Sequence, residues 1–163
     1  MRFSSLIAVS AAFVASAALA QTPAPGPLPY GAPITLDQAK KAMLAAETEA
    51  RKNNWNVAIV VVDSGGNMVA MQRLDGTQIA SIDIAKGKAV TANNFRRPTK
   101  ALEDVIAGGG AGLRLLAVPG VMPLEGGVLV TADGKIIGAI GVSGVLSVQD
   151  AQVARAGAEA AIK

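Results

Sequence analysis

The chain has 163 residues, 51% of them hydrophobic, and a formal net charge of +3. This length fits one packed domain and leaves little room for a second, and the charge excess is too small to indicate a nucleic-acid-binding protein. Histidine and cysteine are both missing from the chain. A Ser-His-Asp triad, a thiolate nucleophile and a typical structural zinc site are therefore excluded.

The N-terminal residues 1–20 have the pattern of a secretory signal peptide. Arg2 precedes an apolar stretch over residues 6–14, and the closing Ala-Leu-Ala has small side chains at the two positions that signal peptidase reads. A membrane anchor is the alternative, but the stretch is shorter than the ~20 residues that a spanning helix needs. We therefore expect cleavage before Gln21, a periplasmic or secreted protein, and no stable membrane span after cleavage.

A proline-rich segment follows at residues 21–33, with five prolines and no hydrophobic periodicity. This composition predicts an extended, disordered arm. The folded domain is accordingly expected to cover residues 34–163.

The first elements of this domain are a helix and a hairpin. Thr35 and Gln38 form a capping-box pattern, and apolar residues then repeat at helical spacing, which predicts a helix over residues 36–53. The apolar runs 57–63 and 68–72 are too short for helices and flank the turn sequence SGGN. They predict two strands joined as a hairpin.

Two helices are expected next. Apolar residues at helical spacing predict a helix over residues 77–95, which Pro98 must end. A short helix is predicted over residues 99–106, and the glycine-rich run at 108–112 cannot continue it. We expect this run to be a loop.

The second half repeats the hairpin. Apolar runs at 127–132 and 135–142 flank Asp133 and Gly134, and an Asp-Gly pair in this position is a strong hairpin signal.

The last helix is expected to start at Ser147, which forms a capping-box pattern with Asp150, and to end at Ala161. Strands joined by tight turns pair antiparallel. The element order therefore predicts an α+β domain with helices packed on an antiparallel sheet.

Glycines interrupt the strand predicted at residues 135–142, where isoleucine and valine otherwise dominate. Because alternate residues face opposite sides of a strand, Gly138 and Gly141 open different faces. A missing Cβ lets a helix or a ligand approach the backbone. We interpret Gly138 as a site of close helix packing, and Gly141, Ser143 and Gly144 as the wall of a ligand pocket.

Polar residues near the strand ends and on the second helix form a candidate site. Asp75 follows the second strand, Lys88 and Thr91 share a helical face because they are three residues apart, and Asp150 begins the last helix. The structural alternative is a turn residue, a solvated lysine and a helix cap.

A basic cluster of Arg96, Arg97 and Lys100 follows the second helix. It can dock carboxylates through charge-assisted hydrogen bonds, with Thr99 beside them. Its alternative is a solubilising surface near a helix start.

Four ordered segments make the chain similar to a known family: VDSGGNMVAMQRLDG, DIAKGKAVTANNFRRPT, PLEGGVLVTADGKIIGAIGVSG and QDAQVARAG. Together they resemble the GlcG/HbpS family of haem-binding and haem-degrading proteins. The resemblance implies a five-stranded antiparallel sheet flanked by helices, as in profilin-like and PAS-like folds. It also implies homo-oligomers, haem binding in exported members and, for some, a sensor partner.

The resemblance places Asp75, Lys88, Thr91 and Asp150 at signature positions of the family. The first hypothesis is therefore an exported protein that sequesters or slowly degrades haem, which it binds through residues of the basic cluster and the glycine-bearing strand. The cofactor-binding candidates are Thr91, Arg96, Arg97, Thr99, Gly141, Ser143 and Gly144. Because the usual axial ligands of haem are His, Cys, Met and Tyr, a chain without His or Cys leaves only methionines, Tyr30 or a weaker donor.

Two alternatives stay open at this point. One is an enzyme or accessory module acting on an organic acid, with Lys88 as base, Asp75 and Asp150 beside it, and the backbone of residues 141–144 holding the anion. The other is a cofactor-free oligomeric partner protein. Whether the protein is an enzyme is not decided by the sequence.

Overall fold

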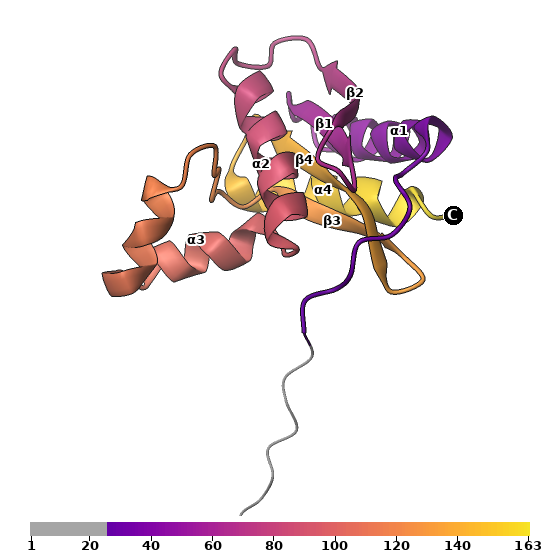
Figure 1. Ribbon diagram of the computed structural model, residues 1–163. Helices are drawn as coiled ribbons and strands as arrows, with labels where there is room; N and C mark the ends of the chain where they lie inside the picture. The colour runs from indigo at the N-terminus through magenta and orange to yellow at the C-terminus, as the bar shows by residue number, and fades with distance from the viewer. Residues whose placement is uncertain (1–25) are drawn as a thin grey trace, which may run out of the picture.

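A computed structural model describes residues 26–163, which form three layers: one sheet lies between helices on its two faces (Figure 1). Helices α1 (Leu36–Lys52) and α4 (Ser147–Ala160) lie side by side on one face of the sheet. Helix α2 (Ser81–Phe95) covers the opposite face. The predicted helix–sheet domain is confirmed. Residues 1–20, for which we predict a signal peptide, lie outside the described part, within which no helix is long and apolar enough to cross a membrane.

The sheet has four strands in the order β2-β1-β4-β3, and all neighbouring strands are antiparallel. They are β1 (Ala58–Asp63), β2 (Met68–Arg73), β3 (Gly127–Ala132) and β4 (Lys135–Ser143). Both predicted hairpins are confirmed. In the second turn, Asp133 and Gly134 have φ values of 49° and 70°, which is the left-handed backbone that this turn requires.

The expectation of five strands is wrong. Where β4 extends beyond the end of β1, residue Tyr30 takes the neighbouring place through one isolated parallel bridge to Ile136. The Gly31 N–H donates to the Ile136 carbonyl at 2.7 Å, and the Ile136 N–H donates to the Pro29 carbonyl at 2.9 Å. A single bridge does not make a strand. The segment from Pro29 onward is nevertheless fixed to the sheet, whereas the sequence predicted a disordered arm up to residue 33.

Strand β1 is apolar from Ala58 to Val62 because this part is buried on both faces. Ala58, Val60 and Val62 pack towards α2, and the alternate residues Ile59 and Val61 pack towards α1 and α4. Such a strand lacks the polar alternation of a half-exposed one. This layer arrangement explains the β-branched run seen in the sequence.

Between α2 and β3 the chain leaves the sheet and forms two short helices that project from the body of the domain (Figure 1). They are α3 (Thr99–Ala107) and a 3-10 helix, η1 (Gly110–Ala117). The sequence predicted α3 but assigned residues 108–112 to a loop. Glycine lowers helix propensity, so the local pattern did not reveal η1.

The two glycines of β4 accommodate close backbone neighbours. A Cβ at Gly141 would overlap the Ala85 carbonyl oxygen and crowd the backbone nitrogen of Ala89, so α2 lies directly on the strand. A Cβ at Gly138 would overlap the Val62 carbonyl oxygen of the neighbouring strand. The prediction of a ligand pocket at Gly141 is wrong, because helix α2 packs there. The prediction of helix packing at Gly138 is also wrong, because the backbone of β1 approaches this glycine.

We predict that Gly141→Ala destabilises the fold by about 2 kcal/mol or more, because the added methyl group overlaps helix backbone that cannot move away as a side chain would. Gly108→Ala is the matched control, since Gly108 has a φ of −70° and its Cβ would meet only ordinary contacts at 3.5 Å or beyond. Urea unfolding of both variants measures the difference. Equal stability of the two would show that α2 does not press on β4.

Candidate functional site

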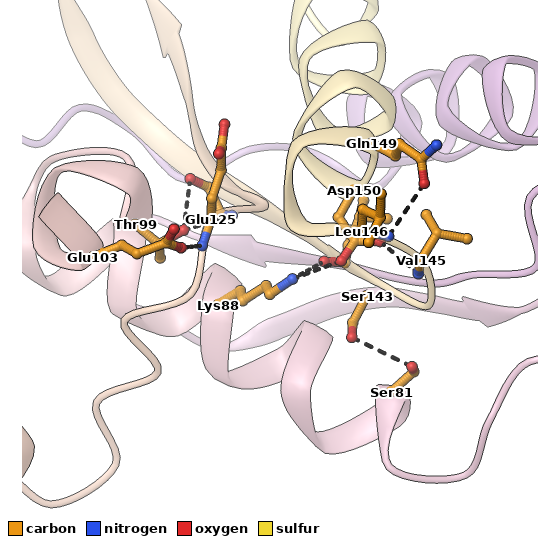
Figure 2. A network of polar contacts seen from close by, with 12 residues as sticks. Ser81, Lys88, Thr99, Glu103, Glu125, Ser143, Val145, Leu146, Gln149 and Asp150 are labelled. Carbon is orange, nitrogen blue, oxygen red and sulfur yellow. Dashed lines mark hydrogen bonds and ion pairs between the residues drawn. The ribbon is translucent and has the colours of Figure 1, made fainter. Parts of the chain in front are cut away.

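A buried ion pair joins α2 to α4 across the end of β4 (Figure 2). The Lys88 Nζ lies 2.8 Å from Asp150 Oδ2, and each side chain is only 2% exposed. The same Nζ donates to the Val142 carbonyl at 2.9 Å. Lys88 is therefore not the solvated helix residue of the structural alternative.

Two glycines leave the room that this lysine occupies. A Cβ at Gly126 would lie 2.8 Å from the Lys88 Nζ, and the φ of Gly126 is 128°. A Cβ at Gly127 would overlap the Lys88 carbonyl oxygen. The start of β3 therefore passes close over α2, and any larger residue here would displace the lysine or the helix.

Asp150 faces the interior and does not form the predicted capping box with Ser147. Leu146 occupies the N-cap position, and its N–H donates to the Gln149 Oε1 at 3.2 Å (Figure 2). The Oδ1 of Asp150 accepts a hydrogen bond from the Val145 N–H at 3.1 Å, which leaves Oδ2 for Lys88. Helix α4 thus begins as predicted, but the capping side chain is Gln149.

Burial raises the pKa of the Asp150 carboxyl above its usual range. The hydrogen bond from Lys88, its positive charge and the N–H groups of Val145 and Gly144 act in the opposite direction without cancelling the effect of burial. A charge in this position needs a partner, because an unpaired buried ion is costly.

Three predicted site residues carry buried hydroxyl groups that bind neighbouring chain segments. Thr91 Oγ1 accepts from the Met122 N–H at 2.9 Å, and Thr99 Oγ1 accepts from the Gly127 N–H at 2.9 Å. The Ser143 hydroxyl donates to the Ser81 Oγ at 3.3 Å (Figure 2). These contacts hold the segment before β3 to α2, the start of β3 to α3, and the end of β4 to α2.

The Gly144 N–H lies beside the Asp150 carboxyl, whereas Asp75 lies away from the Lys88–Asp150 pair. A Cβ at Gly144 would overlap the Asn56 carbonyl oxygen, so this glycine, like Gly141, meets backbone rather than open space. Asp75 lies exposed in the loop after β2 and lines a separate cavity with Trp55. The predicted catalytic trio is therefore split, with Lys88 and Asp150 together and Asp75 elsewhere.

The basic cluster is also divided by the fold. The Arg96 guanidinium carbon lies 5.8 Å from the centre of the Tyr30 ring, a cation–π arrangement. Lys100 pairs with Asp104 on the surface of α3. Arg97, in contrast, lines a cavity.

That cavity is a mainly apolar groove of about 480 Å³ formed by the end of α2, by α3 and by η1. Its lining residues are Phe95, Arg97, Leu102, Val105, Ala111, Gly112, Arg114 and Leu115. We call it the α3–η1 groove.

Both arginines of the α3–η1 groove are held at its rim by their Nε atoms. Arg97 Nε donates to the Phe95 carbonyl at 3.2 Å, and Arg114 Nε donates to the Ala111 carbonyl at 2.9 Å. Within residues 26–163 their terminal N–H groups have no hydrogen-bond partner, and a guanidinium can bind a carboxylate with two parallel hydrogen bonds. The sequence analysis missed Arg114 because this residue reaches the groove only through the fold of η1, which the sequence did not predict.

Cation coordination by clustered side chains is not indicated. Residues 26–163 contain no group of three or more acidic, histidine or cysteine side chains that could hold a metal ion.

The fold and the buried pair define a class of small α+β domains with one antiparallel sheet between helices. Residues 34–159 match the family model described as haem degrading protein HbpS-like. The chain is 44% identical to protein GlcG of Escherichia coli K12 over 111 residues, which cover 68% of this chain and 81% of GlcG. The chain therefore belongs to the HbpS-like family.

Solved structures of similar proteins agree with this assignment. A double mutant of HbpS from Streptomyces reticuli superposes with a TM-score of 0.73 at 38% identity, covering 88% of this chain and 97% of that one. A complex of PduOC with haem superposes with a TM-score of 0.72 at 28% identity, covering 78% and 94% of the two chains.

We predict a strong coupling between Lys88 and Asp150. Lys88→Met and Asp150→Asn each leave a buried charge without its partner and should each cost about 3–5 kcal/mol. The double variant should lose less than the sum, with a coupling energy of about 1–3 kcal/mol in denaturant unfolding.

The surface pair of Lys100 and Asp104 provides the control for this cycle, because Lys100→Met breaks only an exposed ion pair and should leave stability close to that of the wild type. Additive losses in the Lys88–Asp150 cycle would contradict a direct buried interaction.

Proposed function

We propose that the protein binds haem in the α3–η1 groove and sequesters it outside the cytoplasm. The observation that carries this proposal is the pairing of an apolar groove with two rim arginines whose terminal N–H groups are free to bind carboxylates. Haem is flat and apolar and carries two propionates, so its chemistry matches both features. The HbpS-like family and the haem complex of PduOC support the same ligand.

The residues of the groove suit the porphyrin better than the iron. Apolar contacts would come from Phe95, Leu102, Val105 and Leu115, and the propionates would be held by Arg97 and Arg114. The lining contains none of the usual axial ligands, His, Cys, Met or Tyr. Iron in the bound haem would supply redox chemistry, but the groove itself supplies binding and shielding. Sequestration is therefore the role that we propose.

Lys88 has a structural role in this function and not a catalytic one. Its side chain is 2% exposed, and its ammonium group is engaged by Asp150 and the Val142 carbonyl. A general base must reach the proton that it removes, and this lysine has no exposed approach. We assign the pair to holding α2 and α4 on β4, and α2 in turn presents Phe95 to the groove.

Export is part of the proposal and rests on the signal-peptide pattern of residues 1–20. Homo-oligomer formation and a sensor partner stay predictions from the family resemblance.

We predict that haemin binds the purified mature protein stoichiometrically with a shifted Soret band. Arg97→Gln and Arg114→Gln should each weaken binding by about tenfold or more, because each removes a charge-assisted hydrogen-bonding partner worth about 1.5–3 kcal/mol. Titration followed at the Soret band measures both affinities.

The matched control is Lys100→Gln, which removes a positive charge from α3 at a position that does not line the groove and should leave haemin affinity unchanged. Equal haemin affinity of wild type and both arginine variants would refute the α3–η1 groove as the site. An unchanged haemin spectrum with wild type would refute haem binding altogether.

A second prediction concerns processing. Expression of the full chain in a bacterium should yield a mature protein that begins at Gln21 in the periplasmic fraction or the medium. N-terminal sequencing of that material checks the cleavage site, and an intact Met1 in the cytoplasmic fraction would contradict export.

A further inference from the structure

A second cavity, of about 270 Å³, lies between the C-terminal end of α1, the segment entering β1 and the loop after β2. It is lined by Arg51, Asn54, Trp55, Asn56, Leu74 and Asp75. We call it the Trp55 cavity. It shares no lining residue with the α3–η1 groove, and its lining is polar where that of the groove is mainly apolar.

The polar side chains of the Trp55 cavity have hydrogen-bonding capacity that the fold leaves unused. Within residues 26–163, the side chains of Asn54, Asn56 and Asp75 make no hydrogen bond or ion pair to protein. Four polar groups from two separate chain segments thus surround the one tryptophan of the protein. Convergent polar groups of this kind fix the orientation of a small ligand in its site.

Arg51 is positioned for a ligand by a chain of hydrogen bonds behind it. Its Nε donates to Glu47 Oε1 at 2.6 Å, and Glu47 Oε2 accepts from the Gln72 Nε2 at 2.5 Å. The hydrogen bonds from Gln72 and Arg51 lower the pKa of Glu47, so this carboxylate stays charged at neutral pH. The anchor uses only the Nε of Arg51, which leaves the terminal N–H groups of the guanidinium for another acceptor.

The charges in this cavity specify the kind of ligand. Arg51 offers a fork of donors for a carboxylate, and Asp75 offers a carboxylate to an ammonium group. The face of Trp55 attracts cations, and the two asparagines can both donate and accept. Glu47 engages only the Nε of Arg51, so a ligand carboxylate can bind the terminal N–H groups of the guanidinium while an ammonium group of the same ligand binds Asp75.

We propose that the Trp55 cavity binds a small zwitterion with one carboxylate and one ammonium group, that is, a free α-amino acid. Arg51 holds the carboxylate, Asp75 holds the ammonium group, and Asn54 and Asn56 complete the hydrogen bonds. The volume of about 270 Å³ is smaller than the about 300–1,000 Å³ of sites for drug-sized ligands, so the cavity suits a smaller molecule. Asp75 thereby has a binding role separate from Lys88.

Tryptophan fluorescence tests this proposal directly, because Trp55 is the only tryptophan. The haem-free protein is titrated separately with L-alanine and L-glutamine. Propionate and ethylamine, which each carry one of the two charged groups of alanine, and uncharged D-glucose are the control ligands. We expect a saturable change with at least one amino acid in the range up to about 10 mM, and binding at least about tenfold weaker for each half molecule.

Two charge-removing variants locate the effect. Arg51→Gln and Asp75→Asn should each weaken amino-acid binding by about tenfold or more, whereas Lys52→Gln, which changes an exposed neighbour outside the cavity, should not. Circular dichroism confirms that these surface variants stay folded. No saturable change with either amino acid, equal binding of propionate or glucose, or unchanged affinity in both charge variants would overturn the proposal.

Discussion

The close contact between α2 and β4 is the constraint on which the rest of the structure depends. Gly141 has no Cβ at the point where the backbone of α2 crosses the strand, and Ala85 and Ala89 present small side chains to it. This contact brings Lys88 within reach of Asp150 across the end of β4. It also fixes the direction in which α2 ends, and therefore where α3 and η1 begin.

The buried ion pair follows from that contact and adds specificity to it. Two charges removed from water rarely stabilise a fold more than apolar residues would, but they tolerate few alternative arrangements. Lys88 must meet both Asp150 and the Val142 carbonyl, which sets the positions of α2 and α4 on β4. The polar features that can meet ligands, at the α3–η1 groove and the Trp55 cavity, lie outside this rigid centre.

The sequence predicted the local elements well because each depends on neighbouring residues. Capping at Thr35 and the Asp133–Gly134 turn both involve contacts within a few positions, and both are confirmed. Features that depend on distant segments were missed. The helix packed on Gly141, the burial of Lys88 and the contribution of Arg114 to the groove each require the tertiary arrangement, which spacing along the chain does not contain.

The fold thus combines a rigid sheet core with a projecting α3–η1 unit whose groove carries the arginines. We propose that haem binds in this groove and not at the glycine-bearing strand β4. A crystal structure of the mature protein grown with haemin tests this claim most directly. We expect haem in the α3–η1 groove with its propionates at Arg97 and Arg114, and haem bound anywhere else on the chain would contradict the account.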